Sequence, residues 1–381
     1  MYRILRFIVC LSLVVAISYS ARTPEYNFYS FIKSQDNKPA KNIIFMIGDG
    51  MGLTQITAGM YSSRKPLNIE RFQIVGLQKT HSKDDLVTDS AASAVAMARG
   101  IKADNGTFGS SLRSRAPKSI LEEFDDKDLA TGIVVTSSLT HATPAAFFTY
   151  QMYRSMNEEI ALDYLNVGID LLIGGGKKYF DRRTTDNLDL VNKFTNKGYK
   201  VKSFLDGTLK SQRPKQNESF IYFTADSEPL PKTHGRDYLP IACQFAADFL
   251  QKKSDRGFFL MIEGSQIDWG GHGNVSDMVI EEVLDFDHAI GHMLDFAISD
   301  GSTLLLITGD HETGGYSIIK ENEGKLVTHF ATRTHTATMI PVFAYGPGAE
   351  LFQGIYDNTE IYYKLKQASG IDINGFSGQG N

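Results

Sequence analysis

Six short apolar runs, each followed by a cluster of glycine and polar residues, constrain the fold of this chain more than any other feature. Their Ile, Val, Leu and Phe residues do not alternate with polar residues, which is typical of strands buried on both faces of a sheet. Segments between and after the runs have helical patterning instead. The predicted strands are 42–47, 132–135, 170–173, 258–262, 303–307 and 340–345, and the clearest predicted helices are 239–251, 276–299 and 358–367.

Buried strands that alternate with helices predict an α/β fold, namely a single-domain, open and mostly parallel β-sheet sandwiched between helices. We expect one catalytic domain over residues 21–381, because no linker rich in Pro or Ser divides the chain. Residues 177–237 are more polar and are expected to form a surface excursion. Ligands of such sheets bind at the carboxyl ends of the strands, so the polar residues after the six runs are expected to converge on one edge.

The N-terminus has the features of an export signal. Arg3 and Arg6 precede an apolar stretch over 7–17, with small residues after it. This stretch is too short to span a membrane, so residues 1–20 are predicted to be a signal peptide that directs the chain to the periplasm or the medium. Cleavage would leave Cys243 as the one cysteine, which excludes an internal disulfide.

The rest of the composition narrows the class of protein. No later segment is long and apolar enough to span a membrane, so the mature chain is expected to be soluble. The formal net charge of the 381 residues is −5, and the short basic patches look like solvated surface. We therefore expect no nucleic-acid partner.

Acidic and imidazole side chains are concentrated after the apolar runs. Asp49 follows the first run inside a glycine-rich turn, where the backbone allows a ligand to approach closely. A single Asp in such a turn is usually structural, but many uncompensated carboxylates at one site would repel one another. A divalent cation removes that repulsion, and mixed Asp and His ligands suit zinc. The candidate ligands are Asp49, Glu263, Asp268, His272, Asp310, His311 and His335.

Other histidines do not have such neighbours. His288 and His292 are four residues apart, as in a helical ligand pair, but they lie opposite the apolar stripe of the helix 276–299. A solvent-exposed face is therefore the expectation for them and for the acidic residues beside them. Those acidic residues are Glu281, Asp285 and Asp295, and the remaining histidines without comparable neighbours are His81, His234 and His329.

The segment 86–100, with the sequence LVTDSAASAVAMARG, indicates the start of a helix. Thr88, Asp89 or Ser90 is available as its N-cap. A hydroxyl at that place lies in the positive field of the helix N-terminus, where an anion such as phosphate is favoured. Ser90 is therefore a candidate nucleophile as well as a candidate helix start.

Six motifs, taken in order, make the chain similar to one family. They are DGMG at 49–52, TDSAAS at 88–93, HATPA at 141–145, EGSQID at 263–268, GDHETGG at 309–315 and HT at 335–336. In these motifs the chain resembles the bacterial alkaline phosphatases from about residue 40 to residue 370. The resemblance implies an exported phosphatase that hydrolyses phosphate monoesters at alkaline pH through a phosphoserine intermediate, and it implies a homodimer as the common assembly.

The resemblance also implies roles for individual residues. Ser90 matches the serine that becomes phosphorylated, and Arg154 matches the arginine that holds the phosphate. The ligands of one zinc are matched by Asp268, His272 and His335. Those of the second zinc, to which Ser90 also binds, are matched by Asp49, Asp310 and His311. A third metal, usually magnesium, is matched by Asp49, Thr143 and Glu263.

The chemistry of phosphoryl transfer agrees with these roles, because the reaction needs positioning and charge neutralisation more than covalent help. Two zinc ions can hold the attacking and leaving oxygens in line, and one of them favours ionisation of the Ser90 hydroxyl. Arg154 can bind two phosphate oxygens at once, which a lysine cannot do.

Two positions depart from one branch of the family. Where some members carry Asp and Lys near the third metal and the phosphate, this chain has His141 and Trp269. The neutral imidazole removes negative charge, so the third site could take zinc in place of magnesium. Trp269 lacks the charge of Lys, so we expect weaker binding of phosphate. Because the chain is also short for the family, we expect an open site with broad monoester specificity.

Three other functions are considered as alternatives. A phosphodiesterase of the same superfamily typically uses two metals. The third set of candidate ligands argues against that function. A sulfatase needs the sequence C/S-x-P-x-R, which TDSAAS does not match. An exported metal- or phosphate-binding protein without turnover would keep the ligands but would have no use for the nucleophile Ser90.

Overall fold

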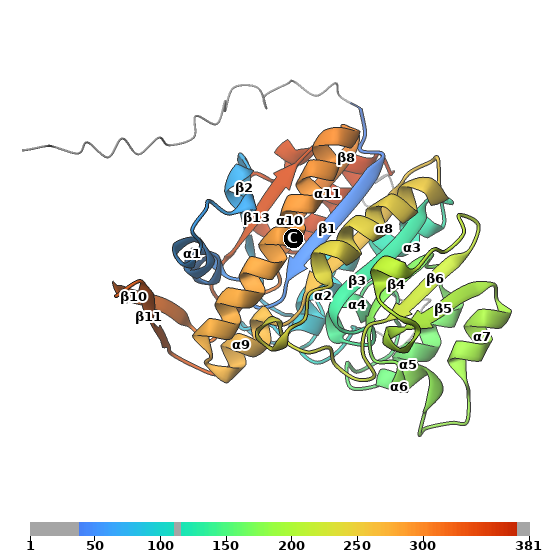
Figure 1. Ribbon diagram of the computed structural model, residues 1–381. Helices are drawn as coiled ribbons and strands as arrows, with labels where there is room; N and C mark the ends of the chain where they lie inside the picture. Colours follow the sequence, from blue (N-terminus) through green and yellow to red (C-terminus); the bar gives the residue numbers. More distant parts are fainter. Residues whose placement is uncertain (1–37, 110–115, 372–381) are drawn as a thin grey trace, which may run out of the picture. The chain divides into compact units, whose positions relative to one another are not determined.

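The structure is a computed structural model that describes residues 38–109 and 116–371 (Figure 1). A ten-stranded sheet forms its centre. In sheet order the strands are β14 (Gly354–Asp357), β2 (Ile74–Lys79), β13 (Ile340–Tyr345), β8 (Thr303–Gly309), β1 (Asn42–Gly48), β7 (Phe258–Gly264), β3 (Ala130–Ser138), β4 (Leu171–Gly175), β6 (Ser219–Phe223) and β5 (Tyr199–Ser203). The predicted signal peptide, residues 1–20, lies outside the described residues.

The prediction of an α/β fold with a mostly parallel sheet is confirmed, and all six predicted runs are strands. One of the six predicted strands does not run in the same direction as the others. β13 is antiparallel to both of its neighbours, β8 and β2, whereas every other pair in the sheet is parallel. The turn at 346–348 therefore lies at the opposite edge, and the expectation that it joins the others was wrong. No helix lies between β8 and β13, and antiparallel neighbours need no helical crossover.

Helices cover both faces of the sheet. In β1 the side chains of Ile44 and Met46 face one core, and those of Ile43, Phe45 and Ile47 face the other. The first core is closed by α1 (Leu53–Ser62), α8 (Leu239–Lys253), α9 (Ile267–Gly273) and α10 (Ser276–Asp300). The second is closed by α2 (Ser90–Arg99), α3 (Ile120–Asp125), α4 (Ala142–Ala145), α5 (Asn157–Asp163), α6 (Lys178–Asp181), α7 (Leu190–Asn196) and α11 (Glu360–Ser369).

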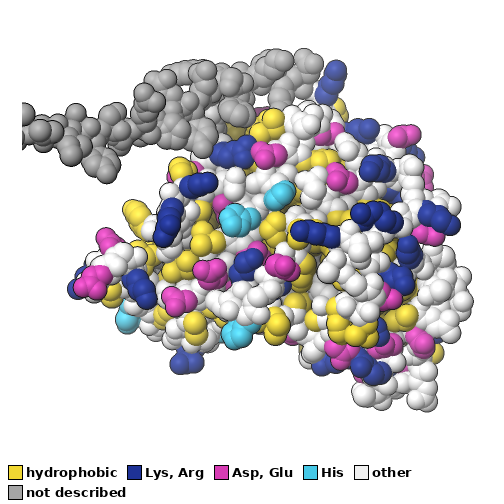
Figure 2. Space-filling view, viewed as in Figure 1, with side chains coloured by type: hydrophobic (Ala, Val, Ile, Leu, Met, Phe, Trp, Pro, Cys, Tyr) yellow, Lys and Arg dark blue, Asp and Glu magenta, His cyan; other side chains and the backbone are white. Residues whose placement is uncertain are grey.

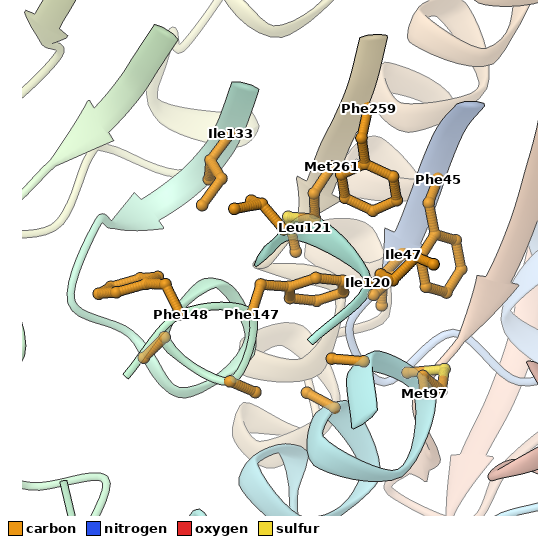
Figure 3. Packing of buried hydrophobic residues seen from close by; sticks show 14 of the residues in the cluster. Phe45, Ile47, Met97, Ile120, Leu121, Ile133, Phe147, Phe148, Phe259 and Met261 are labelled. Atoms are coloured by element: carbon orange, nitrogen blue, oxygen red, sulfur yellow. The ribbon is translucent and has the colours of Figure 1, made fainter. Parts of the chain in front are cut away.

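Aromatic packing in the second core holds the central strands in place (Figure 3). The ring of Phe147, which follows α4, lies 6.1 Å from that of Phe45 on β1 and 6.0 Å from that of Phe259 on β7. Such pairs add roughly 0.5–1.5 kcal/mol each beyond the burial of their area. Because Asp49 and Glu263 come at the ends of these two strands, the core beneath them fixes where the two carboxylates lie.

The segment 177–237 does not form the expected surface excursion, because β5 and β6 within it extend the sheet. The polar side chains that suggested an excursion belong partly to the edge strand β5. Lys200 and Lys202 alternate with Val201 there, and charged side chains of this kind keep an edge strand from pairing with another chain.

The three predicted helices correspond to α8, α10 and α11, and His288 and His292 are exposed on α10 as expected. The exposed position expected for Asp285 is wrong. Its carboxylate is buried, 2.8 Å from Arg236 Nη2 and 2.9 Å from Lys232 Nζ. Both cations come from a segment far away in the sequence that packs against α10, and their charges compensate the buried carboxylate.

Two small antiparallel pairs lie outside the main sheet. β10 (Tyr316–Asn322) and β11 (Lys325–Phe330) form a hairpin, and β9 (Glu312–Thr313) pairs with β12 (His335–Thr336). In the part of the chain that the structure describes, no helix is both long and apolar enough to cross a membrane. Basic and acidic side chains are interspersed over the face seen in Figure 2.

Candidate metal centre and active site

Three groups of potential metal ligands meet at the carboxyl edge of the parallel strands. β1, β7 and β8 end at this edge, and β13, being reversed, begins there, so β12 just before it is brought to the same place. In each group the ligand atoms lie within 4.8 Å of one another. The groups are Asp268 with His311 and His335, Asp49 with Asp310 and His311, and Asp49 with His141 and Glu263.

The turn after β1 needs glycine. Gly50 has φ = +73°, and a Cβ there would lie 2.6 Å from Cα of Asp268. The close approach lets Gly50 N donate a hydrogen bond to Asp310 Oδ1 at 2.9 Å. Asp49 just before it is fully buried, and neither of its carboxylate oxygens has a hydrogen-bond partner among the described residues. A buried carboxylate without partners is costly unless it binds a cation.

The histidines present unprotonated nitrogens to the same space. His335 Nδ1 lies 2.8 Å from the carbonyl oxygen of Thr88, and His272 Nδ1 lies 2.6 Å from that of Arg333. A carbonyl oxygen only accepts, so each neutral ring carries its proton on Nδ1 and its lone pair on Nε2. The two Nε2 atoms are 3.1 Å apart, and each lies within 3.4 Å of a carboxylate oxygen of Asp268. Lone pairs at this separation repel one another unless a proton or a metal ion lies between them.

A threonine orients His311 in the same way. Thr313 Oγ1 donates to Asp268 Oδ1 at 2.5 Å, so it accepts from His311 Nδ1 at 3.2 Å. His311 Nε2 then faces Asp310 Oδ2 at 3.2 Å and Asp49 Oδ1 at 3.6 Å. Metal-binding histidines are commonly oriented by such a hydrogen bond on the second nitrogen. Thr313 is not among the predicted site residues, although it lies in the GDHETGG motif.

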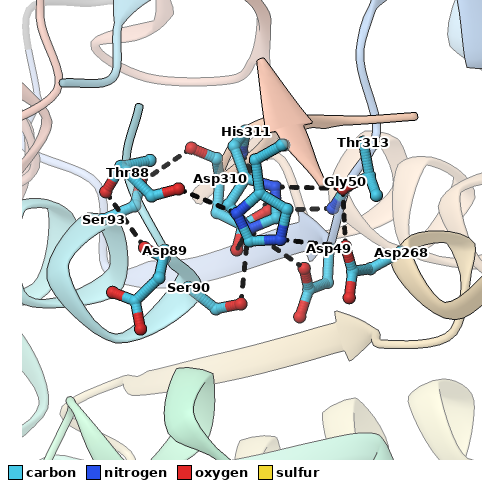
Figure 4. Close-up of polar contacts among 12 residues, drawn as sticks. Asp49, Gly50, Thr88, Asp89, Ser90, Ser93, Asp268, Asp310, His311 and Thr313 are labelled. Atoms are coloured by element: carbon cyan, nitrogen blue, oxygen red, sulfur yellow. Dashed lines mark hydrogen bonds and ion pairs between the residues drawn. The ribbon is translucent and has the colours of Figure 1, made fainter. Parts of the chain in front are cut away.

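Ser90 lies at the first turn of α2 and is 2% exposed. The N-cap is its neighbour Asp89, whose Oδ1 accepts a hydrogen bond from Ala92 N at 3.0 Å. The Ser90 hydroxyl is therefore not used as the cap, and Oγ lies 3.3 Å from His311 Nε2 (Figure 4). In that position the hydroxyl faces the second group of candidate ligands.

Arg154 lies beside the same helix start. Its Nη1 donates to Asp89 Oδ2 at 2.8 Å, and the side chain remains 31% exposed. Asp89 thus caps α2 with one oxygen and holds Arg154 with the other, a second role that the sequence analysis did not assign. A guanidinium held in this way can still donate to two oxygens of an anion.

The third group of ligands, with Thr143 beside it, also lies mostly out of contact with solvent. Thr143 Oγ1, His141 Nδ1 and Glu263 Oε1 are buried atoms without hydrogen-bond partners in the described part of the chain. The Trp269 ring lies 6.2 Å from that of His141 at an interplanar angle of 70°. Unpartnered oxygen and nitrogen atoms that point into one space fit a bound cation.

The electrostatics also favour bound cations. Burial, together with Asp310 and Asp268, raises the pKa of Asp49 well above its usual value. Burial raises the pKa of Glu263 to about 8 and that of Asp310 to about 6. The hydrogen bond to Asp268 raises the pKa of His272 to about 9. Without metal ions, Glu263 and His272 would hold protons at pH 7 in the places where a metal site needs lone pairs.

Comparison with known proteins identifies the family. Residues 40–332 and 324–371 match the family model described as alkaline phosphatase. The chain belongs to this family. It is 32% identical to alkaline phosphatase 3 of Bacillus subtilis, with 90% of this chain and 91% of that protein covered. It is 29% identical to the alkaline phosphatase of Escherichia coli, with 89% and 88% covered.

Solved structures of this family have the same fold. The alkaline phosphatase of the Antarctic bacterium TAB5 is 39% identical and has a TM-score of 0.82, with 88% of this chain and 100% of that chain covered. A variant of the TAB5 enzyme, in which one histidine is replaced by glutamate, has Mg bound in its M3 site; it is 38% identical, with a TM-score of 0.80 and 87% and 99% covered. As an alkaline phosphatase family member, the chain is a phosphatase with several groups of potential metal ligands.

Proposed function

We propose that this family member is an exported phosphomonoesterase that uses Ser90 as its nucleophile. The observation that most supports the proposal is the place of Ser90 Oγ, 3.3 Å from His311 Nε2 at the start of a helix whose cap is a different residue. Residues 1–20 have the pattern of a signal peptide, which supports export to the periplasm or the medium.

We further propose two zinc ions and one magnesium ion. Asp268, His272 and His335 would hold the first zinc, and Asp49, Asp310 and His311 the second. Asp49, Thr143 and Glu263 would hold magnesium, beside the neutral ring of His141. Desolvation lowers the pKa of His141 to about 4, so the ring is neutral and can offer a lone pair to a metal ion. An imidazole also lacks the negative charge of a carboxylate, which leaves this site able to take zinc instead. Bound together, such ions neutralise the charge on the phosphoryl group and favour ionised oxygens around it.

The residues of the chain then carry the reaction in two halves. Ser90 Oγ loses its proton and forms a bond to phosphorus while the bond to the alcohol oxygen breaks. The departing oxygen takes up a proton, so phosphoserine and the free alcohol remain. Water next displaces Ser90 Oγ and releases inorganic phosphate. Arg154 holds two phosphoryl oxygens throughout, and Asp89 keeps its guanidinium in place. These residues contact the phosphoryl group and not the alcohol, so we expect hydrolysis of a broad range of monoesters.

Rates on two substrates test the proposal. A nitrophenyl phosphate monoester should be hydrolysed much faster than the corresponding diester, and acid quenching during turnover should trap phosphate on Ser90. A faster diester reaction would favour a phosphodiesterase, and binding of zinc and phosphate without turnover would favour a binding protein.

Replacement of Arg154 by lysine should lower kcat/KM for a phosphate monoester by about 10-fold to 100-fold, because Lys cannot bind two oxygens in a fixed plane. The measurement is steady-state kinetics of R154K. Arg256→Lys serves as the control, because Arg256 is 62% exposed and pairs with Asp128 next to the start of β7, at the opposite edge of the sheet. Equal kcat/KM values for R154K and wild type would contradict this role.

Replacement of Trp269 by lysine should strengthen product inhibition. A positive charge next to Asp268 would hold phosphate more tightly, by roughly tenfold, and turnover would slow as release became limiting. The inhibition constant of inorganic phosphate measures this effect. Trp269→Phe keeps the ring without the charge and should leave the constant nearly unchanged. Unchanged or faster product release in W269K would count against the prediction.

A further inference from the structure

Glu312 is a buried carboxylate without an ion-pair partner among the described residues. Glu312 directly follows His311 in the sequence, and the residue is 4% exposed. Four hydrogen-bond donors of the protein, and no cationic side chain of the described residues, contact its two carboxylate oxygens. They are Gln55 Nε2 at 2.7 Å, Tyr316 N at 3.0 Å, Gly315 N at 3.2 Å and the hydroxyl of Thr336.

These donors belong to different segments of the chain. Gln55 is on α1, Gly315 lies in the turn before β10, and Tyr316 is the first residue of β10. Thr336 is on β12, directly after His335, and pairs with Glu312 across the two short strands. Glu312 therefore connects the segment that carries His311 to the segment that carries His335. These two histidines belong to different proposed zinc sites.

The side chain of Glu312 also packs against the turn that carries Asp49. A Cβ on Gly52, at the end of the DGMG motif, would lie 2.6 Å from Glu312 Cγ. Glycine at this position thus leaves space for the glutamate. The side chain of Glu312 therefore contacts three segments that bear candidate metal ligands, namely those with Asp49, His311 and His335. Glu312 itself belongs to none of the three ligand groups.

We propose that Glu312 is a positioning residue that sets the spacing between His311 and His335, and with it the spacing of the two zinc sites. The inference rests on the proposed function for the identity of the ions. Glu312 acts through hydrogen bonds to the flanking backbone and to Thr336, and residues that orient ligands in this way typically change metal affinity by about 10-fold to 100-fold when replaced.

The variant Glu312→Gln tests the proposal, because it keeps the size of the side chain. Its amide would direct hydrogens at Gly315 N–H and the Thr336 hydroxyl, both of which donate to the carboxylate. We expect zinc to dissociate from metal-loaded E312Q at least about tenfold more readily, as measured by equilibrium competition with a chelator. Saturating zinc should restore most of kcat, with KM nearly unchanged.

Asp287→Asn is the matched control. Asp287 on α10 is also a buried carboxylate, 3% exposed, and it accepts hydrogen bonds from Asn68 N at 2.8 Å and Ile69 N at 2.9 Å. D287N should lower the Tm but leave zinc affinity at the wild-type value. Zinc affinity of E312Q within about twofold of wild type, or equal losses in both variants, would overturn the proposal.

Thr336→Val provides a second test that does not depend on the folding of E312Q. It removes one donor to Glu312, the one on the strand of His335, and should weaken zinc binding in the same direction. Unchanged zinc affinity in T336V would overturn the proposal. A wild-type protein that bound no zinc would instead refute the proposed metals, and this inference with them.

Discussion

Replacement of Ser90 by alanine is expected to lower the turnover of a phosphate monoester by at least about a thousandfold, while the bound metal stays at the wild-type level. Alanine has no oxygen that can bond to phosphorus, so the covalent half-reaction cannot occur. Apart from the Ser90 hydroxyl itself, the candidate ligands are all still present in S90A, which separates loss of the nucleophile from loss of the ions.

The variant should fold normally, which makes the experiment clear. The cap of α2 is Asp89, so its hydrogen bond from Ala92 N survives the substitution, and alanine is itself a strong helix former. Turnover, acid-trapped phosphate and metal content should be measured together, with Ser254→Ala as the control. Ser254 lies at the end of α8, at the opposite edge of the sheet. Wild-type turnover in S90A would remove Ser90 from the mechanism.

The carboxyl-edge cluster was predictable from the sequence because the topology of a parallel sheet imposes it. Strands such as β1 and β8 run in one direction, so the residues after them meet wherever the strands pair. The direction of β13 was not predictable, because an apolar run carries no information on orientation. The polar edge strand β5 was also not predictable, because an edge strand needs less apolar surface and its sequence shows no apolar run.

The residues that orient the candidate ligands carry less signal in the sequence than the candidate ligands do. Asp49 and His311 stand out as acidic or imidazole groups in glycine-rich turns, and their residue types alone suggest metal binding. Thr313 and Glu312 act by contacts with residues far away in the sequence, such as Asp268 and Gln55. The burial of Asp285 has the same cause, since its cationic partners come from a separate segment. Tertiary contacts of this kind leave no periodic pattern.

Removal of metal ions by a chelator is expected to abolish activity, by at least about a thousandfold, and to lower the Tm by several degrees. Zinc with magnesium should restore both, and calcium, which prefers oxygen ligands, should not. The measurements are elemental analysis, activity and thermal unfolding before and after chelation. Fully active protein without stoichiometric metal would contradict the proposed chemistry.

Chelation should also be accompanied by proton uptake, because protons replace the departing cations. The pKa of Glu263 is raised to about 8 by burial, so without metal this carboxyl is mostly protonated at pH 7. His272, with a pKa raised to about 9, likewise gains a proton below that pH. Metal affinity at the His272 site should therefore fall by about tenfold for each pH unit below 9, for one competing proton, and level off above it. An affinity that did not change between pH 6 and pH 9 would contradict the competition between a metal ion and the His272 proton in this range.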